Sequence, residues 1–127
     1  MGRRRISRGA IAPAMLGLAA CGASPVERDP PAADIAARGK EVIVEAGCAA
    51  CHVIPGISWP RGRVGPPLDE FGDRALIAGR FPNRPAALAA FLRDAPALVP
   101  GTAMPPMPLS EGEARDAAAY LAPLRAR

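Results

Sequence analysis

The 127-residue chain is poor in aromatic residues, with one Trp, one Tyr and three Phe. Because so few bulky side chains leave the polypeptide little material for a hydrophobic core, we expect a large buried apolar cofactor to complete it. No stretch alternates hydrophobic and polar residues in the manner of a strand, and no segment repeats. The sequence therefore predicts one all-α domain, in which 16 Pro and 13 Gly residues favour short helices and long loops.

Basic residues are in excess only near the N-terminus. The chain has 16 Lys and Arg residues against 12 Asp and Glu residues, and Arg3, Arg4, Arg5 and Arg8 account for the whole difference. Without these four arginines the chain is formally neutral, so it lacks the basic surface by which proteins bind nucleic acid. We therefore expect no nucleic-acid partner.

Residues 1–20 have the features of an export signal, in which basic residues precede a short apolar run. The run over residues 10–20 is too short to span a bilayer, which takes about 20 residues. It ends in Leu18-Ala19-Ala20-Cys21, which resembles the bacterial lipobox, where the cysteine receives a diacylglycerol group. We expect an exported protein with a lipoprotein signal peptide, lipid-anchored through Cys21 to a membrane and facing the periplasm or the cell exterior. An ordinary secretory signal with an incidental Cys21 is the alternative.

The segment after the signal, residues 21–31, is polar, rich in proline and without hydrophobic periodicity. These features predict a flexible tether, and a loop packed on the domain is the alternative. The folded domain is expected to cover residues 32–127.

Hydrophobic residues recur at helical spacing in three segments of this domain. We expect helices over residues 33–46, over residues 84–94 with Asn83 as N-cap, and from a Ser110–Glu113 capping box to about Leu124. Residues 74–78 form at most a short helix, residues 81–83 a turn, and residues 53–68 and 96–108 loops. Gly39 lies inside the first helix at a cost of about 1 kcal/mol relative to alanine, which suggests that another helix crosses there closely.

The motif with the clearest chemistry is Cys48-Ala49-Ala50-Cys51-His52, the C-x-x-C-H pattern of c-type haem attachment. Two thiols at this spacing form thioethers with the two vinyl groups of haem, and the adjacent histidine becomes an axial ligand of the iron. Half of a zinc site and a redox dithiol are the alternatives. Zinc needs about four ligands, and the only further cysteine is Cys21, while a redox pair belongs to a βαβ context that is missing here.

Three further segments resemble the class I cytochrome c family over about residues 33–127. They are Gly65-Pro66-Pro67-Leu68, Pro100-Gly101-Thr102-Ala103-Met104-Pro105 and Asp116-Ala117-Ala118-Ala119-Tyr120-Leu121. The resemblance implies a cytochrome c-like fold, with three main helices, short helices and long loops wrapped around one covalently bound haem c. It also implies that Pro66 and Leu68 contact this cofactor, that the Pro66 carbonyl accepts a hydrogen bond from His52, and that the first and last helices cross at Gly39.

The sixth iron ligand is restricted by composition. His52 is the only histidine, which excludes bis-histidine ligation in a monomer, and the only lysine, Lys40, precedes the motif on the wrong side. Outside the signal the remaining thioethers are Met104 and Met107, and either of them, or no protein group, completes the coordination. The resemblance to a G-T-x-M-P loop favours Met104, with Met107 as the alternative.

Trp59 is the only tryptophan and lies in the loop after the haem motif. It is a candidate to cover a haem edge or to donate its indole N–H to a propionate, and ordinary packing is the alternative. Arg61 and Arg63 are expected to be solvated, and contact with the haem propionates is the alternative.

Haem with both axial positions filled exchanges electrons and offers no open site for a substrate. We therefore expect an electron-transfer protein rather than an enzyme, with redox partner proteins that include a terminal oxidase or another respiratory complex. A haem-based sensor or weak peroxidase with a labile sixth ligand, and a fixed haem subunit of a larger oxidase or dehydrogenase, are the alternatives.

Overall fold

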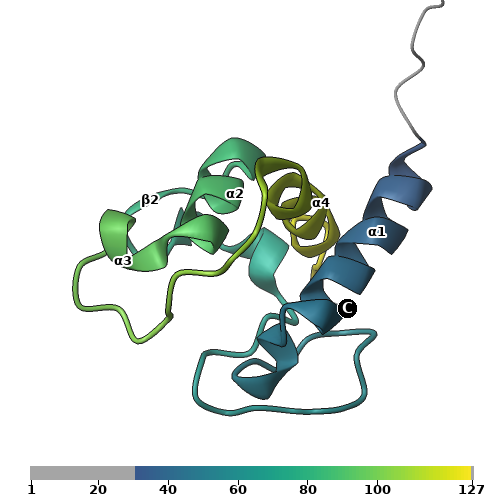
Figure 1. Ribbon diagram of the computed structural model, residues 1–127, viewed down its shortest axis with the longest axis horizontal. Helices are drawn as coiled ribbons and strands as arrows, with labels where there is room; N and C mark the ends of the chain where they lie inside the picture. Colours follow the sequence, from purple (N-terminus) through teal and green to yellow (C-terminus); the bar gives the residue numbers. More distant parts are fainter. Residues whose placement is uncertain (1–30, 127) are drawn as a thin grey trace, which may run out of the picture.

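Two helices, α1 (Ala32–Glu45) and α4 (Glu111–Leu121), pack across each other in the computed structural model, which describes residues 31–126 (Figure 1). The other elements are the 3₁₀ turns η1 (Cys48–Ala50) and η2 (Phe71–Asp73), the strands β1 (Leu76–Ile77) and β2 (Phe81–Pro82), and the helices α2 (Pro85–Arg93) and α3 (Ala95–Leu98). The all-α prediction is confirmed, with one two-stranded sheet in addition. The predicted signal, the lipid site at Cys21 and the predicted tether up to residue 30 lie outside the described residues.

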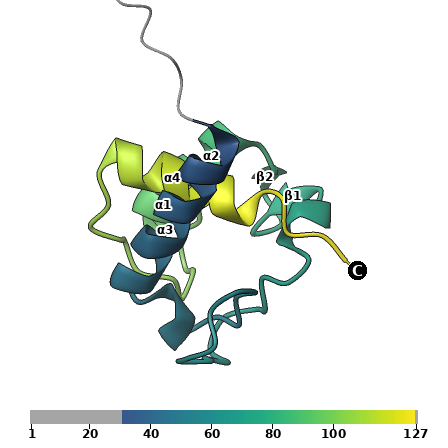
Figure 2. The same ribbon diagram turned by 90° about the vertical axis from the view of Figure 1, so that its right-hand side faces the viewer.

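The crossing of α1 over α4 is as close as a glycine permits (Figure 2). A Cβ atom at Gly39 would lie 2.8 Å from the carbonyl carbon of Asp116 and 3.0 Å from the Cβ atom of Tyr120. Beside this point Arg38 Nε donates to the Asp116 carboxylate at 2.9 Å, which raises the pKa of Arg38. The prediction that another helix crosses at Gly39 is therefore confirmed.

The capping box of α4 is present as predicted, because the Ser110 hydroxyl accepts from the Glu113 N–H and the Glu113 carboxylate accepts from the Ser110 N–H. The helix ends at Leu121, three residues before the predicted end. The predicted loop over residues 96–108 is wrong at its start, where α3 forms and the Asp94 carboxylate accepts from the Ala97 N–H at 3.1 Å.

The prediction that Asn83 caps α2 is wrong. Arg84 occupies the N-cap position without a capping side chain, and Pro85 starts the helix. The Asn83 amide instead donates to the carbonyl oxygens of Phe71, at 2.9 Å, and Arg74, at 3.1 Å. The amide thereby supplies a donor to one carbonyl of η2 and to the carbonyl of the residue that follows η2. These two acceptors would lose this donor if Asn83 capped α2.

The short helix predicted for residues 74–78 and the turn predicted for residues 81–83 are also wrong, because these residues form a β-hairpin. Ile77 pairs with Phe81, and the Arg80 N–H donates to the Ile77 carbonyl at 2.9 Å across a turn whose central residues, Ala78 and Gly79, have φ of 48° and 68°. Positive φ at both central residues is the type I′ conformation. In strands of two residues, an alternation of hydrophobic and polar residues cannot be recognised from the sequence.

Ala78 carries backbone strain that a glycine would relieve. We expect Ala78→Gly to raise the free energy of unfolding by about 0.5–1 kcal/mol, because the left-handed conformation costs an L-residue about 1–2 kcal/mol and glycine loses part of that gain to chain entropy. Ala75→Gly, at an exposed position without positive φ, should lower stability instead. Urea unfolding of the two variants measures both changes in the free energy of unfolding. Equal effects would contradict the strained backbone at Ala78.

The core of the described residues is entirely apolar. Ile43, Ile77 and Leu88 are its largest fully buried side chains, and it holds no buried polar or charged residue. No helix of residues 31–126 combines the length and hydrophobicity needed to cross a bilayer.

Candidate functional site

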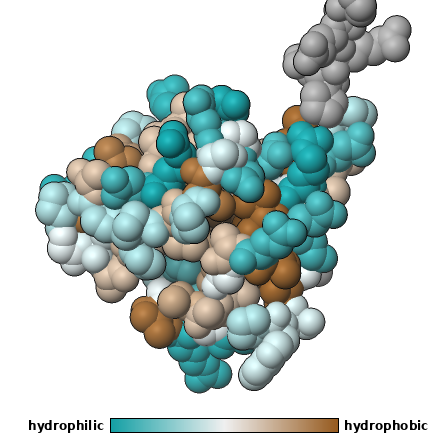
Figure 3. Space-filling model, viewed as in Figure 1, coloured by the Kyte–Doolittle hydropathy of each residue, from teal (hydrophilic) through white to brown (hydrophobic). Residues whose placement is uncertain are grey.

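A cavity of about 570 Å³ lies between the helices and the two long loops. Its wall includes Val42, Ile43 and Ala46 of α1, Leu88, Phe91 and Leu92 of α2, Ala117 and Leu121 of α4, and loop residues from Val64 to Leu68 and from Thr102 to Leu109. On the face of the molecule that Figure 3 shows, hydrophobic residues lie in the middle, beside the hydrophilic surface of α1. The cavity has the size and apolar lining of a cofactor site, which accords with a chain too poor in aromatic residues to fill its own core.

The C-x-x-C-H segment lines this cavity at the end of α1. Gly47, with φ of 70°, turns the chain from α1 into η1, and the His52 N–H then donates to the Cys48 carbonyl at 3.0 Å. Cys48 and Cys51 are free, half-buried thiols. Burial raises the pKa of the Cys48 thiol. The fold thus brings both sulfur atoms and the imidazole to one wall.

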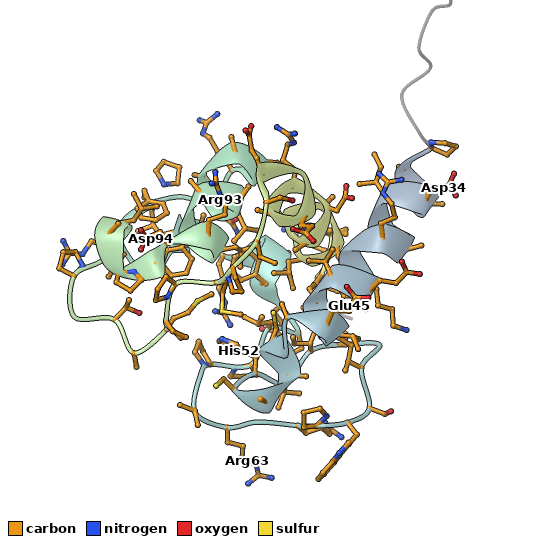
Figure 4. All side chains as sticks on the ribbon, in the orientation of Figure 1. Asp34, Glu45, His52, Arg63, Arg93 and Asp94 are labelled. Atoms are coloured by element: carbon orange, nitrogen blue, oxygen red, sulfur yellow. The ribbon has the colours of Figure 1, made fainter. Side chains whose placement is uncertain are left out.

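Contacts with Gly65 and Pro66 hold the ring of His52, which is labelled in Figure 4, in one orientation. Its Nδ1 lies 2.7 Å from the Pro66 carbonyl oxygen, and since a carbonyl can only accept, Nδ1 carries the proton. The lone pair is therefore on Nε2, the nitrogen that can bind a metal. Gly65 lies against the same ring: a Cβ atom there would fall 2.6 Å from Nδ1 and 2.8 Å from Nε2. The Gly65-Pro66 dipeptide thus orients the imidazole through both a hydrogen bond and a close contact.

Both candidate methionines line the cavity from the loop between α3 and α4. Met104 packs against the hydrophobic core, and its N–H donates to the Thr102 hydroxyl at 3.3 Å. The Met107 N–H donates to the Arg93 carbonyl at 3.0 Å, which ties the loop to the end of α2. The structure therefore brings two thioethers and the imidazole of His52 to one apolar cavity.

Of the two remaining residues predicted to contact the haem, the structure places one on the cavity wall and the other away from it. Leu68 is buried on the cavity wall. Trp59 is 83% exposed and absent from the described wall, so the reading of Trp59 as an ordinarily packed side chain is wrong, and the structure does not bring it together with His52.

Arg74 is a site residue that the sequence reading missed. Among the described residues it is the only lysine, arginine, aspartate or glutamate on the cavity wall. Its guanidinium donates to the Pro67 carbonyl and lies 5.6 Å from the centre of the Phe71 ring. In the sequence Arg74 follows the acidic residues Asp69, Glu70 and Asp73, so no local pattern marked it as part of an apolar cavity.

The family model for cytochrome c matches residues 36–125. The chain belongs to the cytochrome c family. A similar protein is cytochrome c oxidase subunit 2 of Alkalihalophilus pseudofirmus, 34% identical over 100 residues, an alignment that covers 78% of this chain and 28% of that protein. The chain thus spans little more than a quarter of this relative's length. As a cytochrome c, the chain is a haem-based electron-transfer protein.

The residues around the cavity fit haem c. Two thiols adjoin an imidazole with a free Nε2, thioethers share the same cavity, the wall is apolar, and one cation is available to the carboxylates of the haem. The zinc alternative has no ligand set within residues 31–126, where no three His, Cys, Asp or Glu side chains gather closely enough to hold a metal ion.

Proposed function

We propose that the chain is a membrane-anchored monohaem cytochrome c that passes single electrons between respiratory partners. Cys48 and Cys51 would hold the haem, and His52 and Met104 would be its axial ligands. When bound, haem supplies a one-electron redox centre. The observation that carries the proposal is the hydrogen bond from His52 Nδ1 to the Pro66 carbonyl, because it leaves Nε2 directed to ligation inside an apolar cavity that also contains thioethers.

Met104 is proposed as the sixth ligand in preference to Met107. Its loop matches the G-T-x-M-P pattern of the family, and its side chain packs against the core residues that surround the cavity. A thioether opposite a histidine raises the reduction potential relative to two histidines. If His52 and Met104 both bound the iron, no coordination position would remain for a substrate, which supports the proposal of a carrier rather than an enzyme.

Arg74 is proposed to hold the carboxylates of the haem. Its guanidinium is half-buried at the cavity wall and is fixed by the Pro67 carbonyl and the Phe71 ring. A fixed arginine pairs with carboxylates in preferred planar geometry, and it supplies the charge that an otherwise apolar wall lacks.

The proposed place of action is the membrane surface facing the periplasm or cell exterior. The lipobox-like Leu18-Ala19-Ala20-Cys21 would supply two acyl chains, which suffice for stable anchoring. Detergent partitioning of the mature protein, and its loss from the membrane in a Cys21→Ala variant, test this part independently of the haem.

A second candidate is a haem domain that serves one fixed oxidase. It is favoured by the similarity to a protein named cytochrome c oxidase subunit 2. Copurification with an oxidase from membranes at a fixed ratio would support it, whereas recovery of the cytochrome alone supports a free carrier.

Single replacement of the two methionines tests the axial ligand. We expect the wild-type holoprotein to be low-spin and to show the weak long-wavelength methionine–iron band when oxidised. Met104→Ala should abolish the band and lower the potential by on the order of 0.1 V or more, within the range of about 0.8 V that axial ligands span. Met107→Ala, the matched control, should keep the band. Loss of the band only in Met107→Ala would reverse the assignment, and rapid carbon monoxide binding by wild type would favour a sensor or peroxidase.

A further inference from the structure

The most exposed large hydrophobic residues of the described chain lie together on one loop. Trp59 is 83% exposed and Val64 is 78% exposed, and both belong to residues 58–64, here called the Trp59 loop. Exposing a tryptophan to water is unfavourable, and tryptophan is enriched at the centres of protein interfaces. Val64 also lines the haem cavity, so this exposed surface continues into the wall of the cofactor site.

The Trp59 loop is fixed on the backbone of the haem-attachment segment. The Gly62 N–H donates to the Ala49 carbonyl at 2.8 Å, and the Gly65 N–H donates to the Cys51 carbonyl at 2.9 Å. A Cβ atom at Gly62 would lie 2.5 Å from the Cys51 nitrogen, so the backbones touch. Upstream, the Tyr120 hydroxyl donates to the Pro55 carbonyl at 2.6 Å. These contacts preorganise the loop, which lowers the entropic cost of docking on it.

The loop is positively charged. Arg61 and Arg63 are exposed, the loop itself contains no acidic residue, and neither arginine forms an ion pair within residues 31–126. Asp69 borders the same shallow hollow as Arg61. Figure 4 shows Arg63 pointing outward, at the end of the molecule away from Asp34 at the start of α1.

We propose that the Trp59 loop is the docking surface for a protein redox partner whose contact face has an apolar centre and a rim of carboxylates. Trp59 and Val64 would occupy the centre, and Arg61 and Arg63 would meet the rim. The inference rests on the proposed electron-carrier function, and it places the partner against the segment that carries both cysteines. A protein is favoured over a lipid surface because the exposed surface continues through Val64 into the wall of the haem cavity, where a redox partner could exchange an electron.

Electron-transfer rates of the purified holoprotein test this proposal. The variants are Trp59→Ala, the double variant Arg61→Ala/Arg63→Ala, and the control Arg80→Ala/Arg84→Ala, which removes the same charge from exposed residues near the hairpin. The reduced proteins are mixed by stopped flow with an acidic blue-copper protein or with hexacyanoferrate(III), at low and high ionic strength. Thermal unfolding checks that each variant is folded.

With the blue-copper protein we expect the loop double variant to react about 10-fold more slowly at low salt and to lose most of its salt dependence, because steering by opposite charge acts on the association rate. The control should change by less than about twofold. Trp59→Ala should react about fivefold more slowly at both ionic strengths, yet stay within about twofold of wild type with hexacyanoferrate(III), which is too small to need an apolar docking surface.

An unchanged rate of Trp59→Ala with the blue-copper protein, or an equal effect of both arginine pairs, would refute the docking surface. Binding to phosphatidylglycerol vesicles that disappears in Trp59→Ala, with no binding to phosphatidylcholine vesicles, would assign the loop to lipid instead and also refute it. If wild-type holoprotein fails to reduce hexacyanoferrate(III), the carrier function itself fails and the inference with it, whereas normal reduction with insensitive loop variants refutes the docking surface alone.

Discussion

Replacing Gly39 by alanine is expected to lower the free energy of unfolding of the holoprotein by about 2–3 kcal/mol. Alanine has a helix propensity about 1 kcal/mol better than glycine, so propensity alone predicts the opposite sign. The decisive effect is steric, because the added Cβ atom would lie 2.8 Å from the Asp116 carbonyl carbon and closer still to its oxygen. These are helix backbone atoms, so α1 and α4 must separate along their whole contact.

Gly112→Ala is the matched control for this prediction. Gly112 also lies within a helix, α4, but a Cβ atom there meets only the Ser110 hydroxyl oxygen at 4.0 Å. This variant should be neutral or more stable by up to about 1 kcal/mol. Thermal unfolding resolves the pair easily, since 2 kcal/mol shifts the midpoint by at least about 8 °C in a domain of this size. A Gly39→Ala protein as stable as wild type would contradict the close crossing.

Gly39 also illustrates which parts of the fold were predictable. A glycine inside a strongly periodic helix is a local anomaly, and a crossing helix is its simplest explanation. The capping box of Ser110 and Glu113 is likewise local, and it was predicted with the correct partners. The hairpin over residues 76–82 was not, because its strands are two residues long and its turn uses an alanine at positive φ. Asn83 looked like a cap, but its amide donates to the carbonyls of Phe71, in η2, and of Arg74, just after it, which lie 12 and 9 residues away in the chain.

The site likewise contains residues that could be predicted from the sequence and residues that could not. Cys48, Cys51 and His52 are contiguous, so their spacing alone specifies the chemistry. Arg74 reaches the cavity wall only through the packing of η2 and the hairpin, which no local pattern reported. The role of Trp59 depended on whether it is buried, and burial is decided by contacts with residues far away in the sequence. Because Trp59 is 83% exposed, its ring is available for contacts at the protein surface.

Replacing Gly65 by alanine is expected to disrupt the haem site more than any other change of a single methyl group. The new Cβ atom would fall 2.6 Å from His52 Nδ1, so the imidazole has to leave its place and lose its hydrogen bond to the Pro66 carbonyl. Loss of such a hydrogen bond to a ligating histidine typically costs 10–100-fold in metal affinity or activity, about 1.4–2.7 kcal/mol. We expect a lower yield of holoprotein, a lower potential and an increased high-spin fraction.

Pro66→Ala is the control that separates orientation of His52 from general damage to the loop. The acceptor for His52 is the backbone carbonyl of residue 66, which an alanine retains. Pro66→Ala should therefore keep a low-spin spectrum and a potential close to that of wild type, even if the loop loses some stability. Visible spectra and a redox titration of both proteins decide the matter. If Gly65→Ala binds haem with an unaltered spectrum and potential, the ring of His52 is held by haem ligation alone, and the Gly65-Pro66 contact does not orient it.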